Sequence, residues 1–249
     1  MKLDRFVSVV APLHDDAEIV ESYVRETIPI LRDNYTNYEL VLVDDGSRDQ
    51  TVSIASALLS EYDGVRLLRL SREFGEEIAI SAGLDTVIGD FTVVMLPRMD
   101  PPALIPELVR RGTEGNDVVF GVRRTRSGES WLVRKAAAFF YWYCRKVLRL
   151  DLPQNSTQFR CLSRQAVNAI TQIKDSYRYL RLFSSYVGYE RQQFQYDPIY
   201  RGGTYRPRSF FQSVNQAIAL ITENSSHPLR LVSWLGLLAA AGNLFYVGY

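Results

Sequence analysis

The chain of 249 residues contains few residues of the types that form disulfides or metal sites: two cysteines, two histidines and three methionines. Cys144 and Cys161 lack metal-type spacing, which predicts free thiols in a reduced compartment. The formal net charge is only +1, so no general excess of positive charge indicates nucleic acid binding. Gly-x-Gly-x-x-Gly is also missing after the first apolar run, where His14 stands, and this argues against a nicotinamide dehydrogenase.

The first half of the chain alternates apolar runs with helical patterns. The apolar runs predict strands at Phe6–Ala11, Leu40–Val43, Val65–Leu70, Phe91–Met95 and Asp117–Gly121. Helices are predicted between them, at about 17–32, 50–62, 75–88 and 102–111. This order is typical of an α/β fold with a mostly parallel central sheet and helices on both faces. Beyond residue 122 the pattern predicts an aromatic helix over 130–150, a strand over 158–162 and a helix near 164–173.

Two adjacent carboxylates, Asp44 and Asp45, directly follow the second predicted strand, and Gly46 and Ser47 then turn the chain. In open α/β sheets, ligands bind beyond the carboxyl ends of the strands. Paired acids at such a place repel bare phosphate but suit hydroxyls, a base-ring N–H or a metal ion. The pair therefore predicts a nucleotide-sugar site rather than a dinucleotide or P-loop site.

Several short motifs extend this interpretation because they occur in a characteristic order. They are Val9-Val-Ala-Pro12, Leu42-Val-Asp-Asp-Gly-Ser47, Leu70-Ser-Arg-Glu-Phe-Gly75, Asp100-Pro-Pro102, Gln158-Phe-Arg160 and Pro228-Leu-Arg230. With this set the chain resembles the family 2 glycosyltransferases, specifically the polyprenyl-phosphate sugar transferase branch, which includes dolichol-phosphate mannosyltransferases. The resemblance covers nearly the whole chain and implies a nucleotide-sugar-binding, Rossmann-like catalytic domain over residues 1–205.

The resemblance also implies roles for individual residues. Nucleotide-binding roles fall on Pro12, Asp16, Asp44, Asp45, Arg72 and Gly75. Catalytic roles in neutralising the donor diphosphate fall on Arg123 and Arg134, and acceptor-side roles fall on Gln158, Arg160 and Arg201. Arg98 is added to the catalytic residues because it stands where the family normally holds its metal ion. A guanidinium suits a diphosphate because it is always charged and can bind phosphate through two N–H groups. Each arginine taken alone is equally compatible with a solvated surface.

The chain departs from the family pattern where a divalent cation is normally held. The family carries Asp-x-Asp after the fourth strand, but this sequence reads Met95-Leu-Pro-Arg-Met99 there and is one residue shorter. The usual ligands for Mg²⁺ or Mn²⁺ are therefore missing, and no metal site is predicted. Exchanging two carboxylates and a divalent cation for Arg98 changes the local charge from about zero to about +1, so the diphosphate can still be neutralised.

The resemblance implies the transfer of a sugar from a nucleotide-diphosphate sugar to a polyprenyl phosphate or similar membrane lipid, with inversion. The missing metal ligands predict weak or no metal dependence. A lipid phosphate has its second pKa at about 6 and is already anionic at neutral pH, so Gln158 in place of the family's usual acid is tolerable. The alternative is a catalytically degenerate paralogue that binds a nucleotide sugar or acts as a membrane-bound scaffold. The sequence leaves open whether subunits pair as a homo-oligomer.

The C-terminal part carries the membrane prediction. Residues 206–230 include a helical apolar pattern, Ser209–Thr222, which is predicted to lie on a membrane surface. Residues 231–249 contain no charge and are predicted to begin a transmembrane segment, with a buried terminal helix as the alternative. Arg206, Arg208 and Arg230 flank these elements, which predicts a membrane-associated protein with a cytoplasmic catalytic domain.

Three polar residues near the motifs receive structural interpretations. Asp49 and Asp100 precede predicted helices and are interpreted as helix caps. His14 lies at the end of the first predicted strand, and we interpret it as a hydrogen-bonded loop residue rather than a catalytic group.

Overall fold

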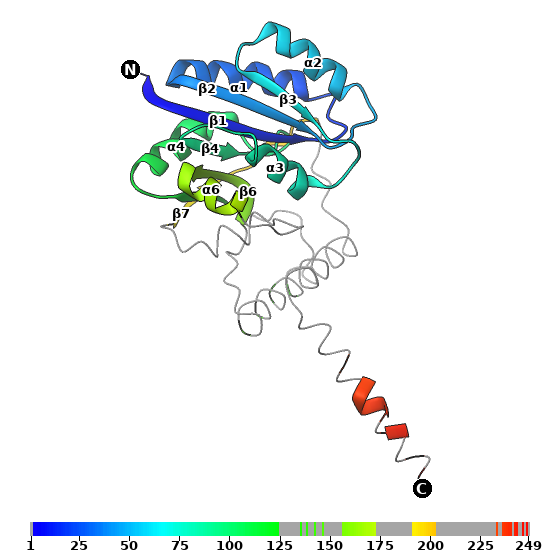
Figure 1. Cartoon of the computed structure of the whole chain (residues 1–249). Coiled ribbons are helices and arrows are strands. Elements are labelled where there is room, and N and C mark those ends of the chain that lie inside the picture. The colour runs from blue at the N-terminus through cyan, green and yellow to red at the C-terminus, as the bar shows by residue number, and fades with distance from the viewer. Residues whose placement is uncertain are drawn as a thin grey trace. The chain divides into compact units, whose positions relative to one another are not determined.

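The computed structural model describes residues 2–124, 156–172, 191–202 and 236–240, together with isolated positions between 135 and 146 and between 233 and 248. The chain divides into two compact units, residues 1–126 with 153–205, and residues 127–152 with 206–249. The first unit contains the central sheet (Figure 1). The predicted juxtamembrane helix over 206–230 lies outside the described residues. The predicted helix over 130–150 is described only at isolated positions, and the terminal segment 231–249 only at 236–240 and at isolated positions.

A seven-stranded sheet occupies the described part of the first unit, in the order β3-β2-β1-β4-β6-β5-β7. Its strands are β1 (Leu3–Leu13), β2 (Tyr35–Asp44), β3 (Val65–Arg69), β4 (Phe91–Val94), β5 (Val118–Arg123), β6 (Ser156–Ser163) and β7 (Arg191–Tyr196). Only β6 runs antiparallel to its neighbours β4 and β5, and every other pair is parallel. The sheet is therefore mostly parallel, as the sequence predicts.

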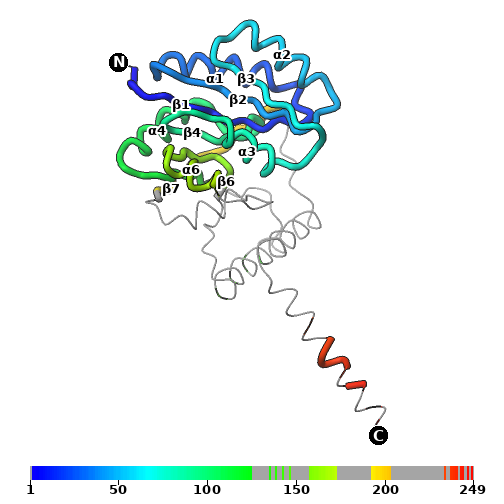
Figure 2. The backbone as a smooth tube through the Cα atoms, viewed as in Figure 1, coloured from blue at the N-terminus to red at the C-terminus, as the bar shows by residue number. Residues whose placement is uncertain are grey.

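The order of the strands creates a reversal beside β1. From β1 the chain proceeds outward to β2 and β3, and then returns to β4 on the other side of β1 (Figure 2). Such a reversal is a topological switch point, where open α/β sheets bind ligands beyond the carboxyl ends of their strands. The loops that follow β1, β2 and β4 therefore mark the expected ligand site.

Helices pack on both faces of the sheet and enclose two apolar cores. One face is covered by α1 (Val20–Asn34), α2 (Thr51–Glu61) and α4 (Ile105–Thr113), which follows the short 3-10 helix η1 (Pro102–Leu104). The other face is covered by α3 (Glu76–Leu84) and α6 (Arg164–Gln172). Val9 of β1 packs in the first core and Val10 in the second, because successive strand residues point to opposite faces. Each fully buried valine or leucine stabilises the fold by roughly 1.5–3 kcal/mol.

The sequence pattern does not predict β7 or the first half of β2. The sequence of β7, RQQFQY, contains three glutamines and lacks an apolar run, although Phe194 and Tyr196 are buried. β2 begins at Tyr35, directly after the last residue of α1, rather than at Leu40. The three residues after Tyr35 are not buried, so this part of the strand has no hydrophobic signature.

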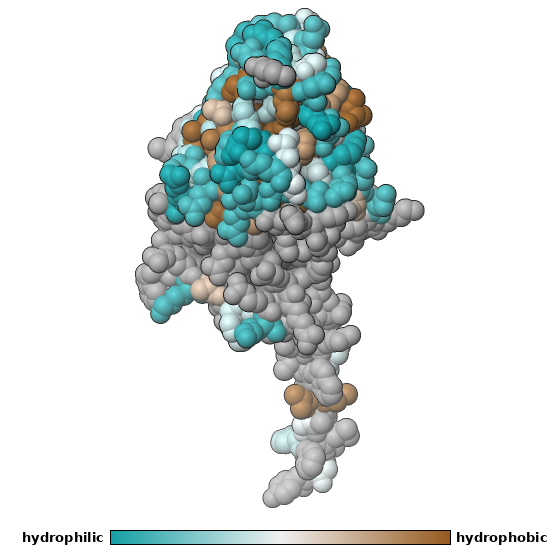
Figure 3. All heavy atoms as spheres, turned by 90° about the vertical axis from the view of Figure 1, so that its left-hand side faces the viewer, coloured by the Kyte–Doolittle hydropathy of each residue, from teal (hydrophilic) through white to brown (hydrophobic). Residues whose placement is uncertain are grey.

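The side of the first unit on which β1 begins is mostly hydrophilic, with small groups of apolar side chains between the polar ones (Figure 3). Scattered exposed apolar residues such as Leu3 and Leu59 are usual on a protein surface. Across the described ranges, no helix is both long enough and apolar enough to cross a bilayer.

Candidate functional site

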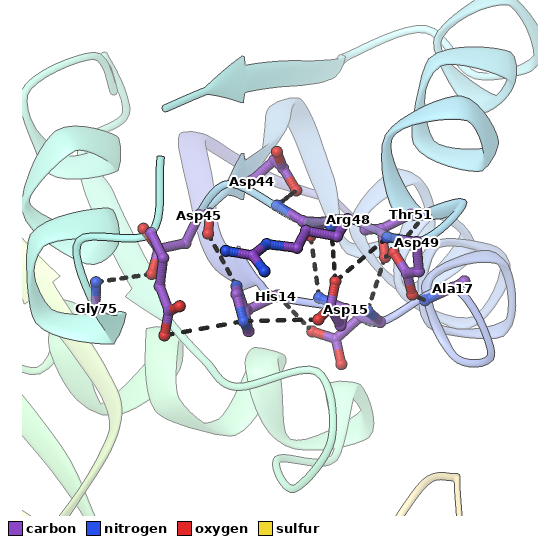
Figure 4. A network of polar contacts seen from close by, with 12 residues as sticks. His14, Asp15, Ala17, Asp44, Asp45, Arg48, Asp49, Thr51 and Gly75 are labelled. Atoms are coloured by element: carbon purple, nitrogen blue, oxygen red, sulfur yellow. Dashed lines mark hydrogen bonds and ion pairs between the residues drawn. The ribbon is translucent and has the colours of Figure 1, made fainter. Parts of the chain in front are cut away.

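Polar contacts join the loop after β1 to the loop after β2 (Figure 4). Asp15 has a positive φ of 49°. Its backbone N–H donates to Ser47 Oγ at 3.0 Å, and its carboxylate accepts from the backbone N–H of Arg48 at 2.8 Å. The backbone N–H of Asp16 donates to Thr51 Oγ1 at 2.7 Å. These bonds hold the two loops together at the carboxyl edge of the sheet.

Asp49 adds a further connection between α2 and the first loop. One carboxylate oxygen accepts from the backbone N–H of Thr51 at 2.9 Å, and the other accepts from the backbone N–H of Ala17 at 3.0 Å. Partial burial raises the pKa of Asp49, but hydrogen bonds from Thr51 and Ala17 outweigh it and lower this pKa overall. The Asp49 side chain satisfies the first amide of α2 from the position before Gln50, which is the N-cap residue and makes no side-chain cap.

The adjacent acids Asp44 and Asp45 have different surroundings. Asp45 is 3% exposed, and its two carboxylate oxygens accept from the backbone N–H groups of Phe74 at 2.7 Å and Gly75 at 2.8 Å. Asp44 is 1% exposed, and within the described ranges its carboxylate accepts one hydrogen bond, from the backbone N–H of Ser47 at 3.3 Å. Asp45 therefore positions the loop between β3 and α3, whereas Asp44 keeps acceptor capacity for a ligand.

Gly46 allows these loops to approach each other closely. It has a positive φ of 68°, and a Cβ at this position would lie 2.5 Å from the carbonyl carbon of Arg72 and the backbone nitrogen of Glu73. On the loop between β3 and α3, the Arg72 guanidinium stacks 4.7 Å from the ring centre of Phe74. Glycine is thus required for Arg72 and Gly75, two predicted nucleotide-binding residues, to lie beside the acids.

His14 lies among the three loops. Its Nδ1 is 2.9 Å from the carbonyl oxygen of Asp45, and because a carbonyl only accepts, Nδ1 carries the hydrogen. Its Nε2 is 3.8 Å from the carboxylate of Asp15 and 3.9 Å from that of Glu73. The hydrogen bond to Asp45 raises the pKa of His14, burial opposes the shift, and the two carboxylates add to it. The contacts support a loop-bridging role for His14.

Arg98 connects the loop after β4 to the loop after β1. Its Nε lies 2.5 Å from Asp16 Oδ1 in an ion pair, and its Nη2 donates to the carbonyl oxygen of Asp15 at 2.8 Å. Asp16 is 5% exposed; burial raises its pKa, while the amide of His14 and the charge of Arg98 oppose this shift. The Arg98 side chain remains 46% exposed. The ion pair thus spans the topological switch point between β1 and β4.

Asp100 fixes the loop that carries Arg98. It is 1% exposed, and its carboxylate accepts from the backbone N–H of Leu96 at 2.7 Å and from the Tyr196 hydroxyl at 2.6 Å. Burial raises the pKa of Asp100 to about 6, against the opposing effects of these two hydrogen bonds and of the nearby Arg123 charge. The interpretation of Asp100 as a helix cap is wrong, because Pro101 is the N-cap of η1 and no side chain caps it. The carboxylate turns back to Leu96 instead.

Arg201 holds the same loop from another direction. Its Nη1 donates to the carbonyl oxygen of Pro97 at 2.7 Å, its Nη2 pairs with the Glu26 carboxylate, and its backbone N–H donates to the carbonyl oxygen of Arg98 at 3.0 Å. The side chain is only 11% exposed. The structure therefore places Arg201, predicted on the acceptor side, as a support for the Arg98 loop.

The site residues Arg123, Gln158 and Arg160 lie on β5 and β6. Arg123 ends β5, and its Nη2 is 3.4 Å from the sulfur of Met99. Gln158 is 1% exposed and donates from its amide nitrogen to the Glu77 carboxylate. Arg160, also 1% exposed, donates to the backbone carbonyls of Thr157 and Gln158. The predicted residue Arg134 lies outside the described residues, and Pro12 is in β1, paired with Val43 of β2.

The family to which the chain belongs is shown by comparison of its sequence with known proteins. The sequence profile described as glycosyl transferase family 2 matches residues 8–170, which is more than half of the chain. The chain belongs to glycosyltransferase family 2. The family predicted from the ordered motifs is thereby confirmed, and the protein is a glycosyltransferase.

Relatives and solved structures agree with this assignment. An uncharacterized glycosyltransferase of Synechocystis is 30% identical over 98% of this chain and 77% of its own length. A bactoprenol glucosyl transferase of Shigella phage SfX is 29% identical over 96% of this chain and 79% of its own length. Glucosyl-3-phosphoglycerate synthase from Mycobacterium tuberculosis, solved with Mn²⁺, UDP-glucose and phosphoglyceric acid, has a TM-score of 0.61 at 19% identity and covers 88% of this chain and 79% of its own. The predicted fold is thereby confirmed.

The side chains at the family's usual metal site do not fit a divalent cation in this glycosyltransferase. Leucine and proline side chains offer no ligand at positions 96 and 97, and position 98 carries a guanidinium. The carboxylate of Asp100 is buried and bonded to Leu96 and Tyr196. Over the described residues, no three histidine, cysteine or acidic side chains gather as a metal site would require. The synthase from Mycobacterium tuberculosis, in contrast, was solved with Mn²⁺.

Sequence reasoning missed three residues that shape this site: Glu26, Glu77 and Tyr196. Each supports a predicted residue: Glu26 pairs with Arg201, Glu77 accepts from Gln158, and Tyr196 donates to Asp100. Tyr196 belongs to the strand that the sequence does not reveal, and the glutamates belong to helices where acidic residues are common. No local signal marks them, because their partners are 80 or more residues away.

Proposed function

We propose that this glycosyltransferase moves a sugar from a nucleotide-diphosphate sugar to a polyprenyl phosphate at a membrane surface, with Arg98 in the place of the family's metal ion. Among its relatives, the bactoprenol glucosyl transferase of Shigella phage SfX supports the acceptor class, and the fold relative solved with UDP-glucose supports the donor class. The predicted cytoplasmic orientation rests on arginines outside the described residues and belongs to this proposal.

The ion pair between Arg98 and Asp16 carries the proposal. A guanidinium has five N–H donors. Among the described residues, the pair with Asp16 and the bond to Asp15 engage Nε and one hydrogen of Nη2, which leaves the remaining donors for a ligand. Because the side chain is 46% exposed and lies at the switch point, these donors can reach a diphosphate bound there.

The chemistry requires little from a general base. The anionic phosphate oxygen of the acceptor attacks the anomeric carbon, a new C–O bond forms, and the bond from that carbon to the diphosphate oxygen breaks. The nucleoside diphosphate leaves with the electron pair, so negative charge develops on it. Arg98, together with Arg123 at the end of β5, stabilises this charge, which is the main electrostatic demand of the step. Attack from the face opposite the leaving group inverts the anomeric centre.

The nucleoside half of the site is assigned to the loops after β1, β2 and β3. Asp44 has acceptor capacity left for a ribose hydroxyl or a base N–H, whereas Asp45 acts by holding Gly75. Pro12, Arg72 and Gly75 complete the nucleotide side. Asp16 is assigned to the same side, and it contacts Arg98 directly, so it joins the nucleoside half to the diphosphate half.

The test is turnover of a panel of UDP-, GDP- and dTDP-sugars with the full chain and a short polyprenyl phosphate in detergent. Formation of a lipid-linked sugar with one donor is the expected result. Binding of a nucleotide sugar without any product would favour the alternative, a membrane-bound binding or scaffold protein. A product with inorganic phosphate or a soluble alcohol, but none with the lipid phosphate, would contradict the acceptor class.

A further inference from the structure

The Gln158 side chain contains a buried acceptor that has no hydrogen-bond partner within the described residues. Gln158 is 1% exposed, its amide nitrogen donates to Glu77, and its Oε1 is buried and unpartnered. Buried polar atoms are almost always hydrogen-bonded, so an unpartnered one in a functional region calls for a ligand or a water as its explanation.

Glu77 determines which atom of the Gln158 amide is left over. A carboxylate can only accept hydrogen bonds, so Gln158 must turn its NH₂ group toward Glu77 and its oxygen away. Glu77 lies in the first turn of α3, where the positive end of the helix dipole favours the charged carboxylate. The unpartnered atom of Gln158 is therefore the amide oxygen Oε1, which requires a hydrogen-bond donor.

The strand register places Gln158 beside the loop that normally carries the metal ligands. Val94, the last residue of β4, pairs with Arg160 of the antiparallel β6. Continuing this register by two residues brings Leu96 level with Gln158. Arg123, at the same edge of the sheet, has a buried Nε without a partner in the described ranges. Gln158 and Arg123 thus contribute one unmatched acceptor and one unmatched donor at this edge.

We propose that Gln158 Oε1 accepts a hydrogen bond from a ring hydroxyl of the transferred sugar, with Glu77 as the positioning residue for its amide. This inference rests on the proposed function and names a contact within it. A phosphate at neutral pH offers acceptors and cannot satisfy Oε1, whereas a sugar hydroxyl can donate to it. The unmatched Nε of Arg123 suits the phosphate side of the same glycosyl phosphate. Gln158, predicted on the acceptor side, is thereby assigned to the donor sugar.

The experiment separates the sugar from the nucleotide by measuring the affinities of UDP-glucose and UDP for the full chain by calorimetry. In Gln158→Met, which keeps the length of the side chain but removes the acceptor, the affinity for UDP-glucose should fall about tenfold while that for UDP changes less than about twofold. Glu77→Gln, which permits either amide orientation, should lose affinity for UDP-glucose alone and by a smaller factor. GDP-mannose with GDP and dTDP-glucose with dTDP are used in the same way if UDP is not the nucleotide.

Gln192→Met is the matched control. Gln192 also has a buried Oε1 without a partner in the described ranges, but it pairs with Val119 near the start of β7, at the opposite end of β5 from Arg123. This variant should leave both affinities unchanged. A monodeoxy UDP-glucose that lacks the contacting hydroxyl should bind the wild type more weakly than UDP-glucose does. Gln158→Met should bind these two ligands equally well, and this pattern identifies the hydroxyl.

Three results would overturn the inference. Equal losses for UDP and UDP-glucose in Gln158→Met would show a structural role only. If Gln158→Met changes neither the affinity for UDP-glucose nor that for UDP, Oε1 binds water only. If the wild type binds none of the nucleoside diphosphates or their sugars, both the proposed function and the sugar contact are contradicted. If the wild type binds them but Gln158→Met gives one of the two results above, only the sugar contact is contradicted.

Discussion

Arg98 and Asp16 form an ion pair at 2.5 Å that joins the loop after β4 to the loop after β1. The carboxylate is buried and the guanidinium is half exposed, so Asp16 fixes the position of a cation that still faces solvent. A fixed donor at the switch point can stabilise a diphosphate without reorganising during the reaction. The predictions below test this arrangement and the loops that hold it.

Arg98→Ala should lower kcat/KM by about 10²–10³, as expected when one preorganised donor to a developing anion is removed. Arg98→Lys should recover only part of the loss, because an ammonium cannot keep the Asp16 and Asp15 contacts and also bind phosphate through two N–H groups. Asp16→Asn should lower kcat/KM in the wild type and lower it by a smaller factor in Arg98→Ala. Steady-state kinetics of the four combinations measures this coupling, and additive losses would contradict a shared function.

Asp44→Asn and Asp45→Asn should have different effects, the first on nucleotide affinity and the second on the free energy of unfolding. Asp45→Asn removes one of two acceptors that hold Phe74 and Gly75, so it should lower the free energy of unfolding by about 1–3 kcal/mol. Asp44→Asn should weaken nucleotide binding with little change in unfolding. Urea denaturation and calorimetry with nucleoside diphosphates check the pair, and the reverse pattern would contradict the assigned roles.

Gly46→Ala should destabilise the protein more than Gly115→Ala. Both glycines have a positive φ, which costs an alanine about 1–3 kcal/mol of strain. A Cβ at Gly46 would also meet the Arg72 backbone at 2.5 Å, whereas a Cβ at Gly115 meets nothing within 4 Å. Chemical denaturation of the two variants gives the difference, and equal effects would show that the loops at Gly46 separate without cost.

Asp100 should give the protein a pH-dependent stability. Burial raises its pKa from 3.8 to about 6 in the folded state, so between these values the folded protein binds a proton that the unfolded chain releases. This contribution to stability is fully present below pH 3.8 and is lost as the pH rises to about 6. The shift corresponds to about 3 kcal/mol.

Asp100→Asn provides the control for this effect because it removes the titration. The difference in unfolding free energy between wild type and variant should move in favour of the variant by up to about 3 kcal/mol from pH 4 to pH 7. Urea denaturation at several pH values measures it. A difference that stays constant with pH would show that Asp100 does not titrate in this range.

Much of the fold follows from the sequence, and the physical reason is the local hydrophobic pattern. The strands β1, β3, β4 and β5 carry apolar runs that mark them, and Asp44 and Asp45 mark the ligand edge because they end such a run. β7 could not be predicted, since its glutamines leave only Phe194 and Tyr196 buried.

The contacts within the site depend on tertiary structure, which the sequence pattern does not contain. The motif Asp44-Asp45 predicts two similar acids, but only the approach of the 74–75 loop shows that Asp45 is occupied by backbone amides. In the same way, the change to Arg98 is visible in the sequence, whereas its pairing with Asp16 requires β4 to lie beside β1.

The most direct measurement of the central claim is sugar transfer by the wild-type protein with excess EDTA and with added Mn²⁺ or Mg²⁺. Since Arg98 is proposed to neutralise the diphosphate, we expect kcat/KM to change less than about twofold between these conditions. Activity that disappears with EDTA and returns with Mn²⁺ would contradict the replacement of the metal ion by Arg98.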